Sequence, residues 1–189
     1  FSLPDACRMA SVRMTESKPA QTRTLPKTKR AFQNAIIGWF AENAEDYPWR
    51  RTHDPYAVLV SELMLQQTQV ATVLGRRYFE RWLEQFPDVS ALAGATEEEV
   101  LKAWEGLGYY RRARNLHKAA QTVVEEFDGE FPYVLADILS LPGVGRYTAG
   151  AVASFAFDQS AAIVDANVAR VLARLFDFGG EVDSPAGQQ

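Results

Sequence analysis

The chain has 189 residues, 47% of them hydrophobic, so it is long enough to bury the core of one domain, or of one domain and part of a second. Its formal net charge of -4 excludes a histone-like protein that binds nucleic acid through bulk positive charge, although backbone amides and a few placed arginines can still hold DNA. The single cysteine, Cys7, excludes a disulfide framework and cannot hold zinc or an iron-sulfur cluster by itself, which favours a reducing compartment.

Residues 1–28 are rich in Ser, Thr, Lys and Pro and show no hydrophobic periodicity, which predicts a disordered or extended basic leader. The first residues lack the charged and then apolar order of a signal peptide. No apolar stretch of the chain is long enough to span a bilayer. We therefore expect an intracellular protein with no membrane partner.

From Lys29 onward the apolar residues recur with a period of 3.6, and alternating β-branched runs are missing. This pattern predicts an all-α chain of seven or eight helices. The final residues, 179–189, resemble the approach to another helix, so we expect them to begin a truncated C-terminal region. The predicted breaks between helices fall at 47–48, 86–87, 106–108, 129–132, 141–145 and 157–160.

Asp54 followed by Pro55 is a strong helix start, and the pattern predicts a helix from there to about Leu74. Glu62 and Gln66 fall on its apolar face. They could be core groups satisfied by hydrogen bonds, or they could form the wall of a wet pocket. In a pocket, a partly desolvated carboxyl has a raised pKa, which suits a general acid.

The hairpin at 141–145 contains two glycines, Gly143 and Gly145, which can adopt positive φ and have no side chain to block close approach. The backbone amides of Gly143, Val144 and Gly145 could therefore face a phosphate at the start of the next helix. A Pro-Gly turn between helices is also ordinary punctuation.

Asp165 precedes the apolar helix that contains Val168 and Leu172. It could be a simple N-cap, a carboxylate at an active site, or both. Asn167 would lie in the first turn, where its amide could order that carboxylate or a substrate oxygen.

Aromatic residues and arginines alternate from Tyr109 to Arg114. A ring there could wedge between stacked bases while guanidinium groups hold phosphates, or the tyrosines could pack a helix start with the arginines in solvent. His53 and His117 are far apart in sequence and have no cysteine partner, so no metal site is expected.

Four segments together resemble the helix-hairpin-helix DNA glycosylases, and specifically the adenine glycosylases of MutY type: SELMLQQTQV (61–70), GLGYY (106–110), LPGVGRYTA (141–149) and VDANV (164–168). The resemblance runs from Lys29 to Phe178. It implies a helix-hairpin-helix glycosylase fold, with a six-helix-barrel catalytic domain at 53–178. It also implies that the N-terminal helix, within 29–52, belongs to a second, cluster-side helical subdomain.

The resemblance also implies roles for individual residues. Glu62 would protonate the adenine and Asp165 would stabilise the cationic sugar, with Tyr147 and Asn167 supporting them. Gln67 and Tyr109 would insert into the opened duplex, and Arg50 and Leu65 would belong to the base pocket.

Tyr147 separates branches of this family, because bifunctional relatives of endonuclease III type carry lysine there and form a Schiff base with the sugar. Thymine-mismatch glycosylases share the tyrosine but not the run at 62–69, so the sequence favours adenine. The resemblance thus implies a monofunctional, monomeric enzyme that removes adenine mispaired with 8-oxoguanine or guanine in double-stranded DNA. The alternatives are a thymine-mismatch or endonuclease III-like glycosylase, or a non-catalytic DNA-binding module. The family also implies a 4Fe-4S cluster, whose cysteine ligands are absent from this chain.

Overall fold

The structure, a computed structural model, describes residues 28–180, and within them it holds ten α-helices, one 3-10 helix and no β-strand. The predicted all-α class is confirmed. The helices outnumber the seven or eight expected because α3, α5 and α8 have only five or six residues each, too few to show a period of 3.6. Most of the expected leader and of the expected C-terminal region lies outside the described residues.

The chain divides into two compact units after Glu45. The first contains α1 (Lys29–Asn43), which begins where the periodicity predicted. The hydroxyl of Thr28 caps this helix by accepting a hydrogen bond from the Ala31 amide at 3.2 Å. The assignment of α1 to a cluster-side subdomain, and the other domain limits, remain predictions.

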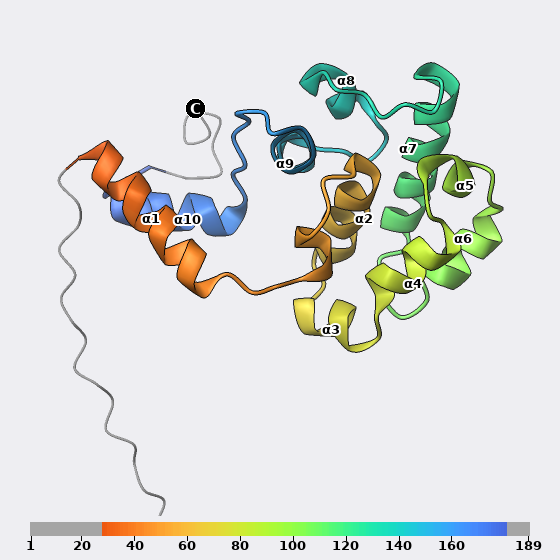
Figure 1. Cartoon of the computed structure of the whole chain (residues 1–189), viewed down its shortest axis with the longest axis horizontal. Helices are drawn as coiled ribbons and strands as arrows, with labels where there is room; N and C mark the ends of the chain where they lie inside the picture. The colour runs from red at the N-terminus through yellow and green to blue at the C-terminus, as the bar shows by residue number, and fades with distance from the viewer. Residues whose placement is uncertain (1–27, 181–189) are drawn as a thin grey trace, which may run out of the picture. The chain divides into compact units, whose positions relative to one another are not determined.

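The second unit contains all the other elements, and Figure 1 shows their order. They are η1 (Pro48–Arg50), α2 (Pro55–Leu65), α3 (Val70–Gly75), α4 (Tyr78–Gln85), α5 (Val89–Ala93), α6 (Glu97–Ala103), α7 (Arg111–Glu126), α8 (Leu135–Ser140), α9 (Arg146–Phe157) and α10 (Ala166–Leu175).

Helix α2 is the centre of this unit. It packs against α9 on one side and against α4 and α7 on the other (Figure 1). Val60 and Met64 on α2 are fully buried, and in the same core cluster the rings of Trp82 and Trp104 meet edge to face with centroids 5.3 Å apart. Such a helix gives a rigid support to any side chain that it carries at the edge of the core.

The predicted helix from Pro55 to Leu74 is wrong in its second half. Helix α2 ends at Leu65, Gln66 is extended, and Gln67 has a φ of 54° before α3 begins at Val70. No glycine or proline marks this break. At this break the guanidinium of Arg112 donates to the carbonyls of Leu63, Met64 and Gln66, which a longer helix would have used.

Among residues 28–180, none of the helices combines the length and the apolar character needed to cross a membrane.

Candidate active site

Helix α2 carries Glu62 at the border between the core and a cleft. Both carboxylate oxygens of Asp54 cap the helix, accepting from the amides of Tyr56 and Ala57 at 3.1 and 3.4 Å. Pro55 at the first helical position fits because its missing N–H would have no partner there. The direction of α2 is thereby set, and Glu62 lies half-buried between Ser61 and Leu63, which are buried.

Glu62 forms a hydrogen-bonded pair with Tyr147 on α9. Burial raises the pKa of the Glu62 carboxyl, and the hydrogen bond from Tyr147 offsets part of that rise. Burial, together with the nearby charges of Glu62 and Asp165, raises the pKa of Tyr147 to about 12. Tyr147 therefore remains a neutral donor at physiological pH, and the Glu62 carboxyl loses its proton at a higher pH than an exposed glutamate does.

Asp165 occupies the N-cap of α10 and uses its two oxygens differently. Oδ1 accepts from the amide of Val168 at 2.7 Å, and Oδ2 accepts from the side-chain amide of Asn167 at 3.2 Å. Asn167 is held in turn by Arg170, whose guanidinium donates to its Oδ1 at 2.6 Å. The capping interpretation is confirmed, and the Asn167 amide binds the carboxylate, which is one of the two partners considered for it.

The chain segment before Asp165 packs closely on α9. A Cβ built on Gly150 would lie 2.6 Å from the carbonyl oxygen of Ala162, so only glycine allows this approach without a shift of the backbone. Gly150 thus helps to place Asp165 near Tyr147. The sequence did not single out Gly150, because a glycine inside a helix gives no sign of what approaches it.

Glu62, Tyr147, Asp165 and Asn167 all line one cleft of about 1040 Å³. The four residues expected to carry the chemistry are therefore brought together by three helices. Their cleft is lined also by Leu65, Gln66, Gln67, Tyr109, Tyr110, Arg111, Arg112, Arg114, Asn115 and Ala166.

Glu62 and Gln66 were expected either to be satisfied by hydrogen bonds or to form the wall of a pocket, and both descriptions apply. Glu62 and Gln66 line the cleft, and each has a partner on α9: Tyr147 for Glu62, and for Gln66 the hydroxyl of Thr148 at 3.4 Å. Leu65 also lines the cleft, as expected. Arg50 is not among its lining residues; its guanidinium lies over the ring of Tyr47 at 4.8 Å, and its place in a base pocket remains a prediction.

The two residues expected to enter the duplex, Gln67 and Tyr109, share an unusual backbone. Their φ angles are 54° and 47°, in the left-handed region that residues with a Cβ rarely adopt. Both side chains are exposed, and Tyr109 is 63% exposed despite its large apolar ring. Strained backbone that presents exposed side chains is typical of functional sites.

For Arg112, both interpretations of the segment from Tyr109 to Arg114 are wrong. It neither points to solvent nor is available to a phosphate, because it is only 7% exposed and donates to five backbone carbonyls and one hydroxyl. Arg114 forms an exposed ion pair with Glu97 at 2.7 Å, and Arg111 is exposed.

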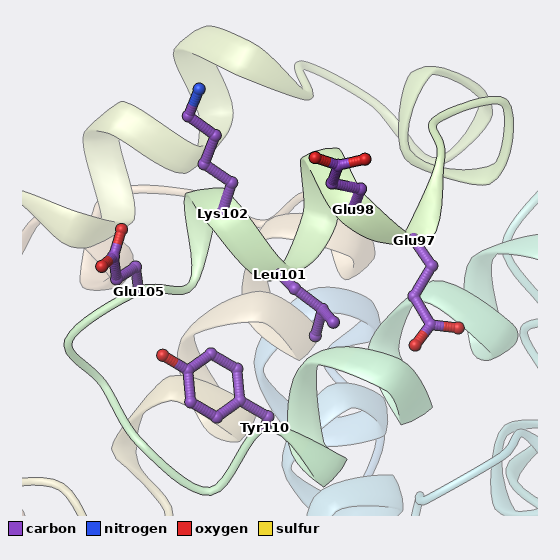
Figure 2. A pocket seen from close by; sticks show the side chains of 6 residues that line it. All are labelled: Glu97, Glu98, Leu101, Lys102, Glu105 and Tyr110. Carbon is purple, nitrogen blue, oxygen red and sulfur yellow. The ribbon is translucent and has the colours of Figure 1, made fainter.

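Tyr110 lines both the cleft and a second hollow, of about 710 Å³, against α6. Figure 2 shows its ring beneath Leu101, with Glu105 nearby. Three glutamates and a single lysine line this hollow, and that charge disfavours phosphate contacts on this side of Tyr110.

The hairpin at 141–145 joins α8 to α9 and completes this region. Gly143 has a φ of 77°, and a Cβ there would lie 2.5 Å from atoms of the Asn115 side chain, so the turn requires glycine. Gly145, at a φ of -93°, does not use positive φ, contrary to expectation; it is the N-cap of α9 and no side chain caps that helix. Val144 is buried and anchors the turn.

Sequence comparison agrees with this geometry. Residues 60–185, more than half of the chain, match the family described as HhH-GPD superfamily base excision DNA repair protein. The chain belongs to the HhH-GPD superfamily. The matched range includes the second half of α2 with Glu62, the hairpin and Asp165, so the family match covers the elements that form the cleft.

Several curated HhH-GPD relatives are similar over most of the chain. The adenine DNA glycosylase of Homo sapiens is 47% identical over 163 residues, covering 82% of this chain and 30% of its own length. The adenine DNA glycosylase of Mycolicibacterium smegmatis is 43% identical over 152 residues, covering 80% of this chain and 50% of its own length. The chain thus spans half or less of these relatives.

Solved structures support the fold. A thermostable thymine-DNA glycosylase superposes with a TM-score of 0.71 at 32% identity, covering 76% of this chain and 65% of its own. An endonuclease III in a non-covalent complex with DNA superposes with a TM-score of 0.68 at 25% identity, covering 85% of this chain and 74% of its own.

The family implies an iron-sulfur cluster, but the residues of this sequence do not fit one. Cys7 is its single cysteine, and residues 28–180 contain no cluster of three or more His, Cys, Asp or Glu side chains that could hold a metal ion. No step of the chemistry below depends on such a group.

Proposed function

We propose that this protein is a monofunctional DNA glycosylase that removes adenine mispaired with 8-oxoguanine or guanine in duplex DNA, acting as a monomer. The observation that carries the proposal is the half-buried Glu62 carboxyl, held by Tyr147 in the same cleft as Asp165. The names of the curated relatives favour adenine over thymine.

The chemistry starts with an adenine turned out of the duplex into the cleft. The protonated Glu62 donates its proton to a ring nitrogen of the base, and the C1′–N9 bond then breaks with its electron pair on the base. The base leaves as neutral adenine. A protonated base is a much better leaving group, and the raised pKa lets the Glu62 carboxyl keep its proton to a higher pH than an exposed glutamate does.

Breaking this bond leaves an oxocarbenium-like sugar, which carries positive charge. The carboxylate of Asp165 is fixed by Val168 and Asn167 before the charge develops, so it stabilises the sugar without having to reorganise. Water then adds to C1′, and its proton passes to the carboxylate that Glu62 became, which restores the acid. These two carboxyl groups divide the work as they do in glycosidases.

DNA would be held by the hairpin and opened by the exposed side chains. The uncapped start of α9 offers backbone amides to a phosphate, so little net positive charge is needed. Gln67 and Tyr109 would fill the space that the extruded adenine leaves.

A direct test offers the intact protein three duplexes, with adenine opposite 8-oxoguanine, adenine opposite guanine, and thymine opposite guanine. Under single-turnover conditions we expect free adenine from the first two and no thymine from the third. Release of thymine without adenine would replace the proposal with a thymine glycosylase. Duplex binding with no base released would identify a non-catalytic module.

A further inference from the structure

Arg112 is the only buried arginine among residues 28–180, and its environment is unusual. No carboxylate pairs with it in the described part of the chain; its partners are carbonyl dipoles and one hydroxyl. Burying a cation is costly unless its donors are satisfied. The burial of Arg112 is therefore costly, and the chemistry of base release does not explain it.

One set of partners surrounds Gln67. Nη1 donates to the carbonyls of Leu63 and Met64 at 2.8 and 3.0 Å and also to that of Gln66, and Nη2 donates to the hydroxyl of Thr68 at 3.1 Å. Arg112 thus binds the residues on both sides of Gln67 and fixes the break after α2 that gives Gln67 its left-handed backbone.

The other set surrounds Tyr109. Nη2 donates to the carbonyls of Leu107 and Gly108 at 3.1 and 3.2 Å, and the guanidinium lies 5.6 Å from the centroid of the Tyr109 ring. The indole of Trp104 also donates to Gly108, at 3.0 Å. The same side chain therefore holds a second left-handed residue in a separate segment of the chain.

We propose that Arg112 is a positioning residue that holds Gln67 and Tyr109 together in their exposed conformations, so that both can enter the duplex in one step. This inference rests on the proposed function, in which Gln67 and Tyr109 enter the opened duplex. A strained conformation persists only where its surroundings hold it, and Arg112 links the two strained turns. It does not touch the reacting atoms and acts through the two inserted side chains.

The test compares Arg112→Lys with Thr68→Val in the intact protein. Lysine keeps the charge, but its single ammonium cannot reach the six acceptors of a planar guanidinium. Valine keeps the shape of Thr68 and removes one acceptor beside Gln67. Thr72→Val, an exposed site on α3 outside the cleft, is the matched control.

We expect Arg112→Lys to slow single-turnover adenine release by about 10- to 100-fold, because misplacing a positioning element costs factors of this size. Affinity for undamaged duplex should change little. Thr68→Val should slow release by about 3- to 10-fold, and Thr72→Val should leave the rate unchanged. If Arg112→Lys does not fold, the comparison of Thr68→Val with Thr72→Val tests the proposal.

A double-mutant cycle separates positioning from general stability. When Gln67→Ala and Tyr109→Ala are already present, Arg112 has nothing left to position, so Arg112→Lys should then slow release by less than about 3-fold. In the Gln67→Ala background, Thr68→Val should likewise add almost nothing. If Arg112→Lys slowed release by the same factor in the wild type and in the Gln67→Ala, Tyr109→Ala background, the proposal would be overturned.

Hydrogen exchange in the DNA-free protein keeps this test independent of the proposed function. The amides of Thr68 and Leu107 donate to Leu65 and Trp104 at 3.3 and 3.1 Å, so they report on the two turns. Arg112→Lys should speed exchange at both amides, and Thr72→Val at neither. If the wild type releases no adenine, the proposed function fails, and unchanged exchange in Arg112→Lys would separately overturn the positioning role.

Discussion

Glu62 is subject to two opposing effects, since burial raises the pKa of its carboxyl and the hydroxyl of Tyr147 lowers it. A general acid works in its protonated form, so the single-turnover rate should fall as pH rises through the raised pKa of Glu62. A pH profile between about pH 5 and 8 tests this. A rate that rises throughout that range would show that Glu62 acts as a base or not at all.

The same raised pKa has a consequence for stability. The folded state binds the Glu62 proton more tightly than the unfolded chain does, so this contribution is complete below the unfolded pKa and is lost as pH rises through the folded pKa. Glu62→Gln should therefore gain thermal stability relative to the wild type as pH rises. Melting curves of both proteins at several pH values provide this second readout of the same shift.

Asp165 combines a capping role with a proposed chemical one, and Asp165→Asn separates them. Asparagine caps a helix as well as aspartate, so the melting temperature should change little. The negative charge facing the sugar is lost, and release should slow by roughly 10²- to 10³-fold. Single-turnover kinetics and a melting curve of this variant measure the two effects. A large drop in melting temperature with unchanged kinetics would leave helix capping as the only role of Asp165.

At the scale of elements, the sequence predicted those helix ends that carry a local signal. Asp54 with Pro55 started α2, and the glycines and prolines at 106–108, 129–132 and 141–145 each fall between helices. The break at 66–69 could not be predicted, because it has no glycine or proline and the side chain that binds it, Arg112, lies 44 residues beyond Thr68 along the chain. Tertiary contacts overrode local propensity there.

In the candidate site, too, some residues could be predicted from the sequence and others could not. Glu62 and Asp165 stood out because a carboxylate on an apolar face and a carboxylate before a helix are visible in the sequence. The roles of Asn115 and Gly150 were not visible, since each depends on a close approach by a distant segment. The burial of Arg112 was likewise hidden in a cluster that looks cationic and solvated.

Gly150 provides a test of the contact between α9 and the segment that leads to Asp165. Gly150→Ala places a methyl group 2.6 Å from the carbonyl oxygen of Ala162, so the backbone must shift. We expect a loss of about 1–3 kcal/mol in the free energy of unfolding, and slower release because Asp165 moves. Chemical denaturation and single-turnover kinetics measure the two effects.

Gly75→Ala is the matched control for this substitution. Gly75 is also helical, at the end of α3, and a Cβ there meets nothing within 4 Å. The control should be neutral or slightly stabilising, because alanine loses less backbone entropy on folding. Equal behaviour of the two alanine variants would remove the role assigned to Gly150.

At the scale of the whole molecule, one cleft brings together Glu62, Tyr147 and Asp165 from three separate helices. Tyr147, a neutral phenol, lies in the cleft, where no lysine is among the lining residues. A lyase needs an amine to attack the sugar. The intact protein should therefore leave abasic sites that break only after alkali or heat, and borohydride should trap little covalent complex.

Tyr147→Lys would introduce such an amine and could create some trapping. Lys102 lines the hollow against α6 (Figure 2) and not the cleft. Efficient trapping by the wild type would contradict the monofunctional assignment and indicate chemistry of the endonuclease III type.

The most direct test of the central claim measures adenine release and duplex binding together for wild type and Glu62→Gln. Glutamine keeps the shape of Glu62 and can still accept from Tyr147, but it has no proton to give. We predict that release from an adenine and 8-oxoguanine duplex slows by about 10²- to 10⁴-fold while the dissociation constant for that duplex stays nearly unchanged. Release within about a factor of two of the wild type would contradict the assignment of Glu62 as the general acid.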